Sequence, residues 1–415
     1  MHLLCLAISI LAAGPLVYYL LAAYCAWEHF RRVRKMAAPD PSFRPAVSIL
    51  KPVRGLDREA YANFASFCRL DYPEYEILFA VSSREDPAVA IIENLQRQFP
   101  KRQIRLLADV PRVGTNDKVN KLCLLAKEAQ HDVLVICDSD VRVEPDCLVE
   151  VTAALARPEV GLVTALFRGL PGEKLASKLE ALGVSAASAA SALIAQKLEG
   201  NLRFAFGWMM ATTKRHLAEI GGFEAISHHH SDDFEIGNRI ASKGHRVEFM
   251  RKHVWMVFPN ETIGELLRRE IRWSVGLRNV RGLGYLGLAF TFGLPWTVLA
   301  ASVAPDKTIA GAVVLAYLAS RFAMAWTVGV WGIGDPAVRR NILLLPLRDA
   351  VDFGVWLGGW FSNQIHWRGV TYRITKGLLI PLADEGTAVD AARSSESVSR
   401  KHPAEGINLA TRSRI

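Results

Sequence analysis

The stretch that decides the fold is Val133-Leu134-Val135-Ile136-Cys137-Asp138-Ser139-Asp140. Its uncharged apolar run predicts a strand that is buried on both faces, and two aspartates follow the run directly. Because Asp138 and Asp140 are two positions apart, their side chains fit on the same side at the carboxyl end of the strand. A solvated turn is the alternative, since Asp and Ser are common in turns. Two carboxylates at a strand end suit Mg²⁺ or Mn²⁺, and such an ion would in turn hold a diphosphate.

Similar apolar runs alternate with amphipathic stretches on both sides of this segment. The expected strands are residues 46–50, 76–81, 104–107, 132–137, 161–166, 204–212 and 246–250. The expected helices between them include residues 88–99, 118–130, 146–156 and 176–198. This alternation predicts an α/β fold with a mostly parallel sheet and helices on both of its faces. Ligands of such sheets bind at the carboxyl ends of the strands, where the two aspartates are expected.

The composition of the whole chain points to a membrane. The 415 residues include 50 Lys and Arg against 41 Asp and Glu, which gives a net charge of +9, and 51% are hydrophobic. These values exclude a disordered or fibrous protein and disfavour an ordinary soluble enzyme. No helix-turn-helix, zinc or RNA-binding signature accompanies the positive charge, so we expect no nucleic-acid partner. The six cysteines show no CxxC spacing, which argues against a zinc knuckle or a redox pair.

The first 30 residues are expected to form a transmembrane anchor. Residues 3–27 carry no charge, and about 25 residues suffice to cross a bilayer core of about 30 Å. A signal peptide, the alternative, would need a basic region before its apolar core, where only His2 stands. Residues 31–45 are expected to be a basic juxtamembrane linker with three prolines. Four cations follow the anchor and place the next domain in the cytoplasm by the positive-inside rule: Arg31, Arg32, Arg34 and Lys35.

Residues 283–367 are expected to return to the membrane. Residues 283–304 and 309–334 predict a helical hairpin. Residues 342–367 are apolar but contain Arg348, Asp349 and Asp352, which favours a re-entrant or interfacial segment over a span. That arrangement keeps the basic tail, residues 368–415, in the cytoplasm, and we expect disorder from Asp384 onward. The prediction is therefore a multi-pass protein of the inner (cytoplasmic) membrane.

A second acidic motif, Ser231-Asp232-Asp233-Phe234-Glu235, opens an expected helix. Ser231 or Asp232 as a simple N-cap is the plain interpretation. Two adjacent acids that follow three histidines instead favour a polar loop in an active site. Metal binding by His228, His229 and His230 is disfavoured, because consecutive residues seldom converge on one ion.

A third motif, Arg268-Arg269-Glu270-Ile271-Arg272-Trp273, lies shortly before the second apolar region. Arg269 and Arg272 are three positions apart and would share one face of a helix. Guanidinium groups pair with phosphate oxygens, whereas the alternative is a basic helix that contacts anionic lipid. We therefore expect an α/β domain over residues 46–260, followed by an interfacial helix over residues 261–282.

Together with further motifs, these three resemble a known family. The additional motifs are Lys51-Pro52-Val53-Arg54-Gly55 with Asp57, Phe67-Cys68-Arg69-Leu70-Asp71-Tyr72-Pro73, Asp86-Pro87, and Asn116-Asp117-Lys118-Val119-Asn120. In this order they resemble the ceramide glucosyltransferase-like enzymes, which are inverting membrane glycosyltransferases of the GT-A fold and include relatives that act on hopanoids. The resemblance covers roughly residues 46–280 and the flanking membrane segments.

The resemblance implies a role for each matching residue. Asp233 is the expected catalytic base, with Asp232 as the second candidate because relatives often have Glu there, and Asp140 is the expected metal ligand. Seven residues match donor-binding positions: Asp86, Lys118, Asn120, Asp138, Arg269, Arg272 and Trp273. Trp273 and the two arginines correspond to a (Q/R)xxRW motif beside the diphosphate and the acceptor.

The function implied is transfer of a hexose, glucose or N-acetylglucosamine, from a UDP-sugar to a lipid hydroxyl with inversion. The expected cofactor is Mg²⁺ or Mn²⁺, and the expected acceptor is ceramide or a hopanoid. A processive polysaccharide synthase is the enzyme alternative, but three or four apolar segments are few for a translocation channel. A non-catalytic membrane scaffold is the alternative from another class, and it should not bind UDP.

Overall fold

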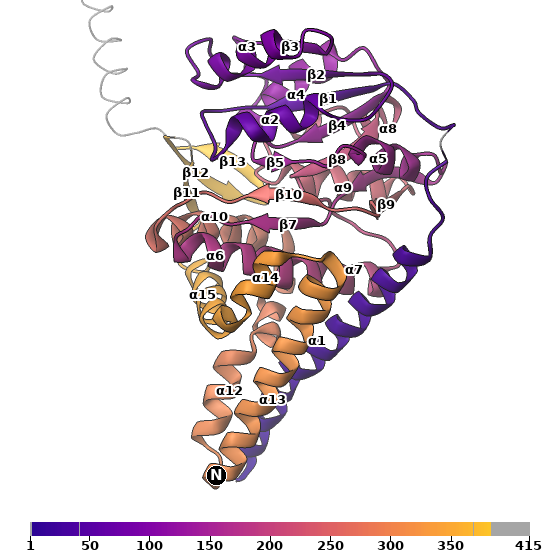
Figure 1. Cartoon of the computed structure of the whole chain (residues 1–415). Helices are drawn as coiled ribbons and strands as arrows, with labels where there is room; N and C mark the ends of the chain where they lie inside the picture. Colours follow the sequence, from indigo (N-terminus) through magenta and orange to yellow (C-terminus); the bar gives the residue numbers. More distant parts are fainter. Residues whose placement is uncertain (1, 41, 368, 383–415) are drawn as a thin grey trace, which may run out of the picture.

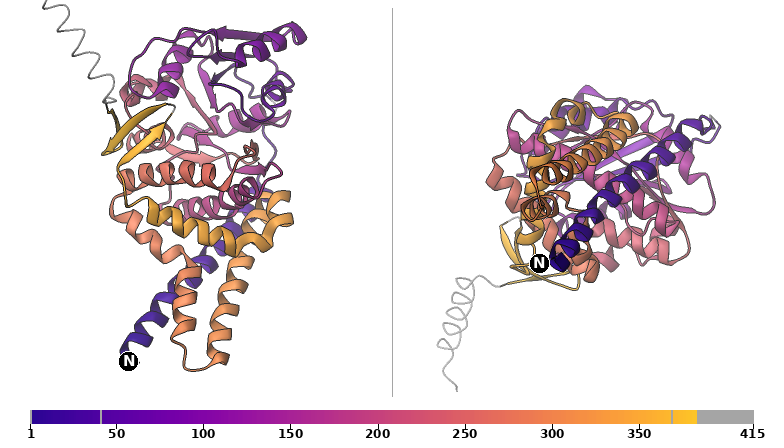
Figure 2. Two further views of the ribbon diagram at one scale, coloured as in Figure 1. Left: turned by 90° about the vertical axis from the view of Figure 1, so that its left-hand side faces the viewer. Right: turned by 90° about the horizontal axis from the view of Figure 1, so that it is seen from below.

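The computed structural model describes residues 2–40, 42–367 and 369–382. A stalk of helices carries an α/β domain at one end (Figure 1). The stalk consists of α1 (His2–Lys35), α12 (Gly293–Ser302) and α13 (Lys307–Ala325). Three further helices lie across the base of the domain, next to the stalk (Figure 2): α6 (Leu175–Leu182), α10 (Ile263–Arg281) and α15 (Leu345–Gly358).

The central sheet has seven strands in the order β3-β2-β1-β4-β8-β6-β9 and is mainly parallel, which confirms the predicted fold class. Its strands are β1 (Val47–Pro52), β2 (Tyr75–Ala80), β3 (Gln103–Leu107), β4 (Val133–Cys137), β6 (Val160–Thr164), β8 (Met209–Thr213) and β9 (Arg246–Phe249). Each strand overlaps a strand that the sequence predicted. Three short strands form a second sheet in the order β5-β10-β7: β5 (Val141–Arg142), β7 (Phe167–Leu170) and β10 (Val254–Val257).

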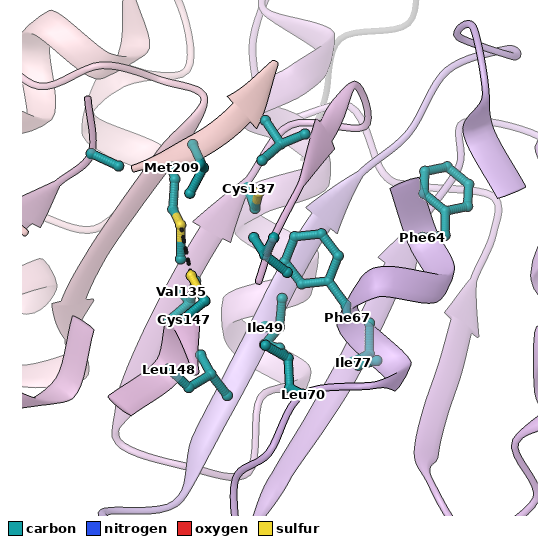
Figure 3. Packing of buried hydrophobic residues seen from close by; sticks show 14 of the residues in the cluster. Ile49, Phe64, Phe67, Leu70, Ile77, Val135, Cys137, Cys147, Leu148 and Met209 are labelled. Atoms are coloured by element: carbon teal, nitrogen blue, oxygen red, sulfur yellow. Dashed lines mark hydrogen bonds between the residues drawn. The ribbon is translucent and has the colours of Figure 1, made fainter. Parts of the chain in front are cut away.

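Helices cover both faces of the central sheet, because its strands are apolar at successive positions. Alternate residues point to opposite faces, so that Ile49 and Val135 belong to one core cluster whereas Leu50 and Leu134 belong to another. The first cluster includes residues of α2 (Ala60–Cys68), α3 (Ala88–Gln98) and α5 (Cys147–Leu155) (Figure 3). The second includes residues of α4 (Asp117–Glu128) and α7 (Ala189–Glu199).

Strand β8 runs antiparallel to both of its neighbours, β4 and β6. Its amino end therefore lies at the edge of the sheet where β4 has its carboxyl end, and Met209 pairs with Cys137. The sequence predicted that this strand begins at residue 204, but it begins at Met209. The preceding residues leave the sheet and form a loop beside the aspartates, and the backbone N–H of Asp138 donates to the carbonyl of Trp208 at 3.2 Å.

Three helical segments in the described part of the chain are long and apolar enough to cross a membrane: Ile10–Lys35, Leu175–Glu199 and Lys307–Ile333. A fourth candidate is the pair Leu283–Thr291 and Gly293–Ser302, which is bent by 58°. The N-terminal anchor and the helical hairpin were expected, whereas Leu175–Glu199 was expected only as a helix. In its most apolar window 72% of the residues are buried inside the protein, against 28% and 22% for the other two, so this segment belongs to the folded domain.

The third apolar segment, residues 342–367, contains α15, which at 14 residues is too short to span a bilayer. Its charged residues face protein partners. Arg348 donates to both carboxylate oxygens of Glu270 in α10, at 2.7 and 3.1 Å, and also pairs with Asp352 at 2.6 Å. Asp349 accepts from Arg321 of α13 at 2.8 Å. Buried charges of this kind require partners, and the pairs fix α15 against both helices.

The end of this segment and the start of the expected tail instead form a small antiparallel sheet of β11 (Gln364–Trp367), β12 (Val370–Thr375) and β13 (Leu378–Pro381). Strands in this first part of the basic tail were not predicted from the sequence. Alternating apolar residues pack one face of this sheet against α10. Lys376 and Gly377, with φ of 50° and 81°, form the tight hairpin turn. The disorder expected from Asp384 onward lies outside the described residues.

The helix that carries the second acidic motif, α9 (Asp232–Ser242), packs closely on the chain before β8. A Cβ at Gly237 would lie 2.4 Å from the carbonyl carbon of Phe204 and 2.6 Å from the nitrogen of Ala205. Both neighbours are backbone atoms that cannot rotate away, so close helix packing here requires glycine.

We predict that Gly237→Ala lowers the free energy of unfolding by about 2 kcal/mol or more, because the added methyl group overpacks this contact. The matched control is Gly354→Ala in α15, where a Cβ meets nothing within 4 Å. The control should be neutral or stabilising by up to about 1 kcal/mol. Thermal unfolding of the detergent-purified variants measures both effects, and equal shifts would contradict the packing argument.

Candidate active site

A partly buried lysine joins the two acidic motifs. The Lys118 ammonium, near the start of α4, lies 2.8 Å from Asp138 at the end of β4 and 3.1 Å from Asp232 at the start of α9. Burial alone would lower the pKa of Lys118, but the carboxylates of Asp138, Asp232 and Asp233 raise it above its usual value. Lys118 therefore stays charged and compensates the acids, so that segments about a hundred residues apart meet at one edge of the sheet.

Asp233 faces the loop before β8. Its carboxylate accepts hydrogen bonds from the backbone N–H groups of Gly207 at 3.0 Å and Phe234 at 2.8 Å. Burial and the neighbouring Asp232 raise the pKa of Asp233 to about 6. At neutral pH the group is ionised, and its pKa lies close enough to 7 for efficient general-base catalysis.

Asp232 has a different environment from its neighbour. It is the first residue of α9, and its carboxylate pairs with Lys118. Ser231 occupies the N-cap position, but its side chain makes no capping hydrogen bond. The interpretation of this motif as a simple helix cap is therefore wrong, and the two aspartates differ in their partners: a cation for Asp232 and backbone N–H groups for Asp233.

Asp140 has the properties of a cation ligand. Its Oδ1 atom is buried and has no hydrogen-bond partner in the described part of the chain. Burial, together with Asp138 and Asp57, raises the pKa of Asp140 to about 8. Ser139, between the two aspartates, donates to Asp57 at 2.5 Å, which brings a third carboxylate close. A divalent cation would relieve this concentration of negative charge, so the residues present fit Mg²⁺ or Mn²⁺.

The protein supplies few ligands for such an ion. Among residues 2–40, 42–367 and 369–382, no group of three or more His, Cys, Asp or Glu side chains is arranged to hold a metal. Asp140 and Asp138 would therefore hold the ion together with water and ligand oxygens. Mg²⁺ is commonly bound in this way, by one or two carboxylates and substrate phosphates.

Asp86 and Asn120 shape the loops beside the sheet. The Asp86 carboxylate accepts from the backbone N–H groups of Gly55, at 2.9 Å, and Ala88, at 2.9 Å. The Asn120 amide oxygen accepts from the N–H of Gly114 at 2.7 Å, and its amide nitrogen donates to the Gly114 carbonyl at 3.1 Å. These hydrogen bonds fix the backbone of the two loops. Contact of Asp86 and Asn120 with a sugar donor stays a prediction.

The third motif lies on α10, which begins with a capping box of Thr262 and Glu265. Its two arginines have different surroundings. Arg269 forms two hydrogen bonds of 2.6 Å with Glu261 and also pairs with Glu180. Arg272 instead lies close to His230 in the loop of three histidines, residues 228–230, which we call the histidine loop. The side chain of Trp273 is 38% exposed. The structure thus places Arg272 near the acidic motif and Arg269 among carboxylates, and their roles with a donor stay predictions.

The three histidines face three different partners. His228 lies 3.4 Å from Thr115, His229 lies 3.8 Å from Glu235, and His230 lies 3.2 Å from Ser231. Burial and the nearby Arg272 lower the pKa of His230 to about 4, so its ring is neutral at pH 7. This divergence agrees with a polar loop beside the aspartates rather than a metal site.

Sequence reasoning missed several residues that the structure brings to this site. Lys51 lies near the end of strand β1, and its buried ammonium donates to the Asp138 carbonyl at 2.9 Å. A lysine inside an apolar strand was the available signal. No local pattern marks Gly207, which contacts Asp233, or Trp367, which contacts Arg272 and His230, because tertiary structure alone brings these residues together.

Comparisons with known proteins give one family and several distant relatives. A model of the family described as "Glycosyl transferase family 21" matches residues 7–380. Ceramide glucosyltransferase 1 of Caenorhabditis elegans is 23% identical over 270 residues, which cover 65% of this chain and 56% of that protein. A ceramide glucosyltransferase of Komagataella phaffii is 29% identical over 159 residues, which cover 36% of this chain and 31% of that protein. The chain thus spans about half the length, or less, of these curated relatives.

Solved structures resemble the chain only loosely. A mannosyltransferase from Pyrobaculum calidifontis in complex with GDP-Man and Mn²⁺ is 18% identical, with a TM-score of 0.49, over 85% of this chain and 97% of that one. TarS of S. aureus in complex with UDP-GlcNAc is 10% identical, with a TM-score of 0.38, over 82% of this chain and 99% of that one.

The raised pKa of Asp140 predicts a pH dependence of stability. Without metal, the folded protein holds a proton on Asp140 up to about pH 8, whereas the unfolded chain releases it near the ordinary value of 3.8. Stability should therefore fall as the pH rises from about 4 to about 8. Asp140→Asn removes this titration, so the melting temperature in EDTA should depend less on pH and exceed that of the wild type near pH 8.

The same measurement includes its own metal control. Added Mn²⁺ favours the ionised carboxylate, so it should raise the melting temperature of the wild type, most at high pH, and have little effect on Asp140→Asn. Parallel pH curves for the two proteins, with or without Mn²⁺, would show that Asp140 is not the titrating group.

Proposed function

Because the chain belongs to glycosyl transferase family 21, we propose that it is a membrane enzyme that transfers a hexose from a UDP-sugar to a lipid hydroxyl. The sugar is glucose or N-acetylglucosamine, and the acceptor is ceramide or a hopanoid. One observation carries the proposal: Lys118 holds the two acidic motifs together at the carboxyl edge of the sheet, close to the arginine helix α10.

The donor half of the site is the end of β4. Transfer requires that the negative charge on the departing diphosphate be compensated. Asp138 and Asp140 would hold Mg²⁺ or Mn²⁺, which supplies this charge compensation when bound. Lys118 and Arg272 add positive charge from the protein itself, and Asp86 would contact the nucleotide base.

The acceptor half is the start of α9. Asp233 takes the proton from the acceptor hydroxyl as the hydroxyl oxygen bonds to the anomeric carbon of the sugar. The bond between that carbon and the diphosphate oxygen breaks, and UDP leaves with its electron pair. A single base without a covalent intermediate gives inversion at the anomeric carbon. The pKa of Asp233, about 6, supports its role as the base.

The membrane supplies the acceptor. Helix α10 lies across the base of the domain, next to the stalk (Figure 2), so a lipid hydroxyl would reach the site at a fixed depth. Trp273 and Leu277 are one helical turn apart on α10 and are 38% and 40% exposed. A cytoplasmic domain on an inner-membrane protein is part of the proposal, and it is supported by basic residues in the last turn of α1, at the domain end of the stalk: Arg32, Arg34 and Lys35.

A reconstitution experiment tests this function. Purified protein in vesicles is incubated with a panel of UDP-sugars, with ceramide or hopanoid, and with Mn²⁺, Mg²⁺ or EDTA, and products are identified by mass spectrometry. One sugar added to one lipid is the expected result. A series of longer chains would instead support the processive synthase, and absence of both UDP binding and product would support the scaffold. Asp140→Ala should lose the Mn²⁺-dependent part of UDP binding.

We predict that Asp233→Asn lowers kcat by about 10²-fold or more, because Asn keeps the size of the side chain but cannot accept a proton. The affinity for UDP should change little. Asp232→Asn is the matched neighbour: it retains an oxygen for Lys118 and should cost less activity. Steady-state kinetics with calorimetric UDP titration measures both variants, and the reverse ranking would move the base to Asp232.

A further inference from the structure

The C-terminal sheet is joined by backbone hydrogen bonds to the loop that leads into the acidic motif. The N–H of His230 donates to the Gly377 carbonyl at 2.9 Å, and the N–H of Leu379 donates to the His228 carbonyl at 2.8 Å. His229 and Leu378 also form an antiparallel bridge. The β12–β13 turn thus extends the histidine loop, and it holds the segment that immediately precedes Asp232.

The other side of this sheet packs on α10. Buried residues of the sheet form one cluster with Val275 and Ile271 of the helix: Ile365, Tyr372, Ile374 and Leu379. A Cβ at Gly276 would lie 2.6 Å from the His230 ring, so α10 and the histidine loop are also in direct contact. The sheet therefore fixes the position of the arginine helix relative to the acidic motif.

Trp367, at the end of β11, lies where these contacts meet. Its ring centroid is 5.7 Å from the Arg272 guanidinium carbon and 5.8 Å from the His230 ring. A guanidinium near an aromatic face is attracted by the ring quadrupole, and the contact restricts the rotamers of a flexible side chain. Because the His230 ring is neutral at pH 7, it does not repel Arg272 from this arrangement.

We propose that Trp367 is a positioning residue of the active site, which holds Arg272 toward the donor diphosphate and His230 behind the acidic motif. This inference rests on the proposed function, because it assigns Arg272 to the diphosphate. It also makes the C-terminal sheet a part of the site, although the sheet follows the membrane segments in the chain. The site is then complete only when β11, β12 and β13 are folded onto α10.

The structure offers a matched control on the same helix. Arg278, further along α10, lies 5.7 Å from the ring centroid of Trp360, the same distance as in the Arg272 pair. In the described part of the chain, the Trp360 ring contacts Tyr285 and Trp356 rather than the acidic motif. Trp367→Ala and Trp360→Ala therefore remove the same kind of contact inside and outside the proposed site.

We expect Trp367→Ala to lower kcat/KM for the UDP-sugar by roughly tenfold, mainly through a higher KM, and to weaken UDP binding in Mn²⁺. Trp367→Phe keeps an aromatic face and should restore most of the loss, while Trp360→Ala should change kcat/KM less than about threefold. If Trp367→Ala does not fold, Trp367→Leu, which keeps apolar volume without a ring, replaces it in the comparison. Unchanged kinetics, or an equal loss in Trp360→Ala, would overturn the inference.

A double-mutant cycle with Arg272→Ala tests whether Trp367 acts through this arginine. In the Arg272→Ala background, Trp367→Ala should have little further effect on kcat/KM, because the group that it positions is gone. Losses that multiply independently would overturn the inference. Failure of the proposed function has a different signature, since the wild type itself would then neither bind UDP nor form a glycolipid.

Discussion

The site depends on the ion pairs that the ammonium group of Lys118 forms. This group lies between a carboxylate at the end of β4 and a carboxylate at the start of α9, and a third carboxylate, Asp233, is adjacent. Buried acids at this separation would repel one another, and each would lose its hydration. A fixed cation in their midst lets strand end and helix start approach closely. At Asp140, by contrast, burial and the neighbouring acids outweigh the positive charge of Lys51, and its pKa is raised to about 8.

The fold places further parts of the site around this ion pair. The antiparallel direction of β8 brings the Gly207 backbone to Asp233, and Lys51 supports the Asp138 backbone from inside the sheet. The C-terminal sheet packs on α10 and is hydrogen-bonded to the loop that leads into the acidic motif. In this member of glycosyl transferase family 21, the proposed site thus lies at the carboxyl edge of a mainly parallel sheet, while α10 and the C-terminal sheet come from later parts of the chain.

The sequence was informative wherever the signal was local. Apolar runs such as residues 133–137 predicted every strand of the central sheet, and the order of its motifs indicated the family. Contacts between distant residues leave no local pattern, so neither the Lys118 ion pairs nor the Trp367 contacts could be predicted. In residues 342–367 the charges of α15 argued against a membrane span, but their partners on α10 and α13 could not be found from the sequence. The alternation at Tyr372 and Ile374, in the expected tail, was not recognised as a strand. The hairpin turn at Lys376 and Gly377 was the overlooked signal.

The adjacent opposite charges of Arg348 and Asp349 have a consequence for biogenesis. Their partners, Glu270 on α10 and Arg321 on α13, precede them in the chain and emerge first from the ribosome. Until α15 is synthesised, a carboxylate and a guanidinium therefore remain exposed near the bilayer, where uncompensated charge is costly. Once α15 is in place, Arg348 pairs with Glu270 and Asp349 pairs with Arg321. The helix then connects α13 of the stalk to α10. A chain that ends before α15 therefore leaves Glu270 and Arg321 without these partners.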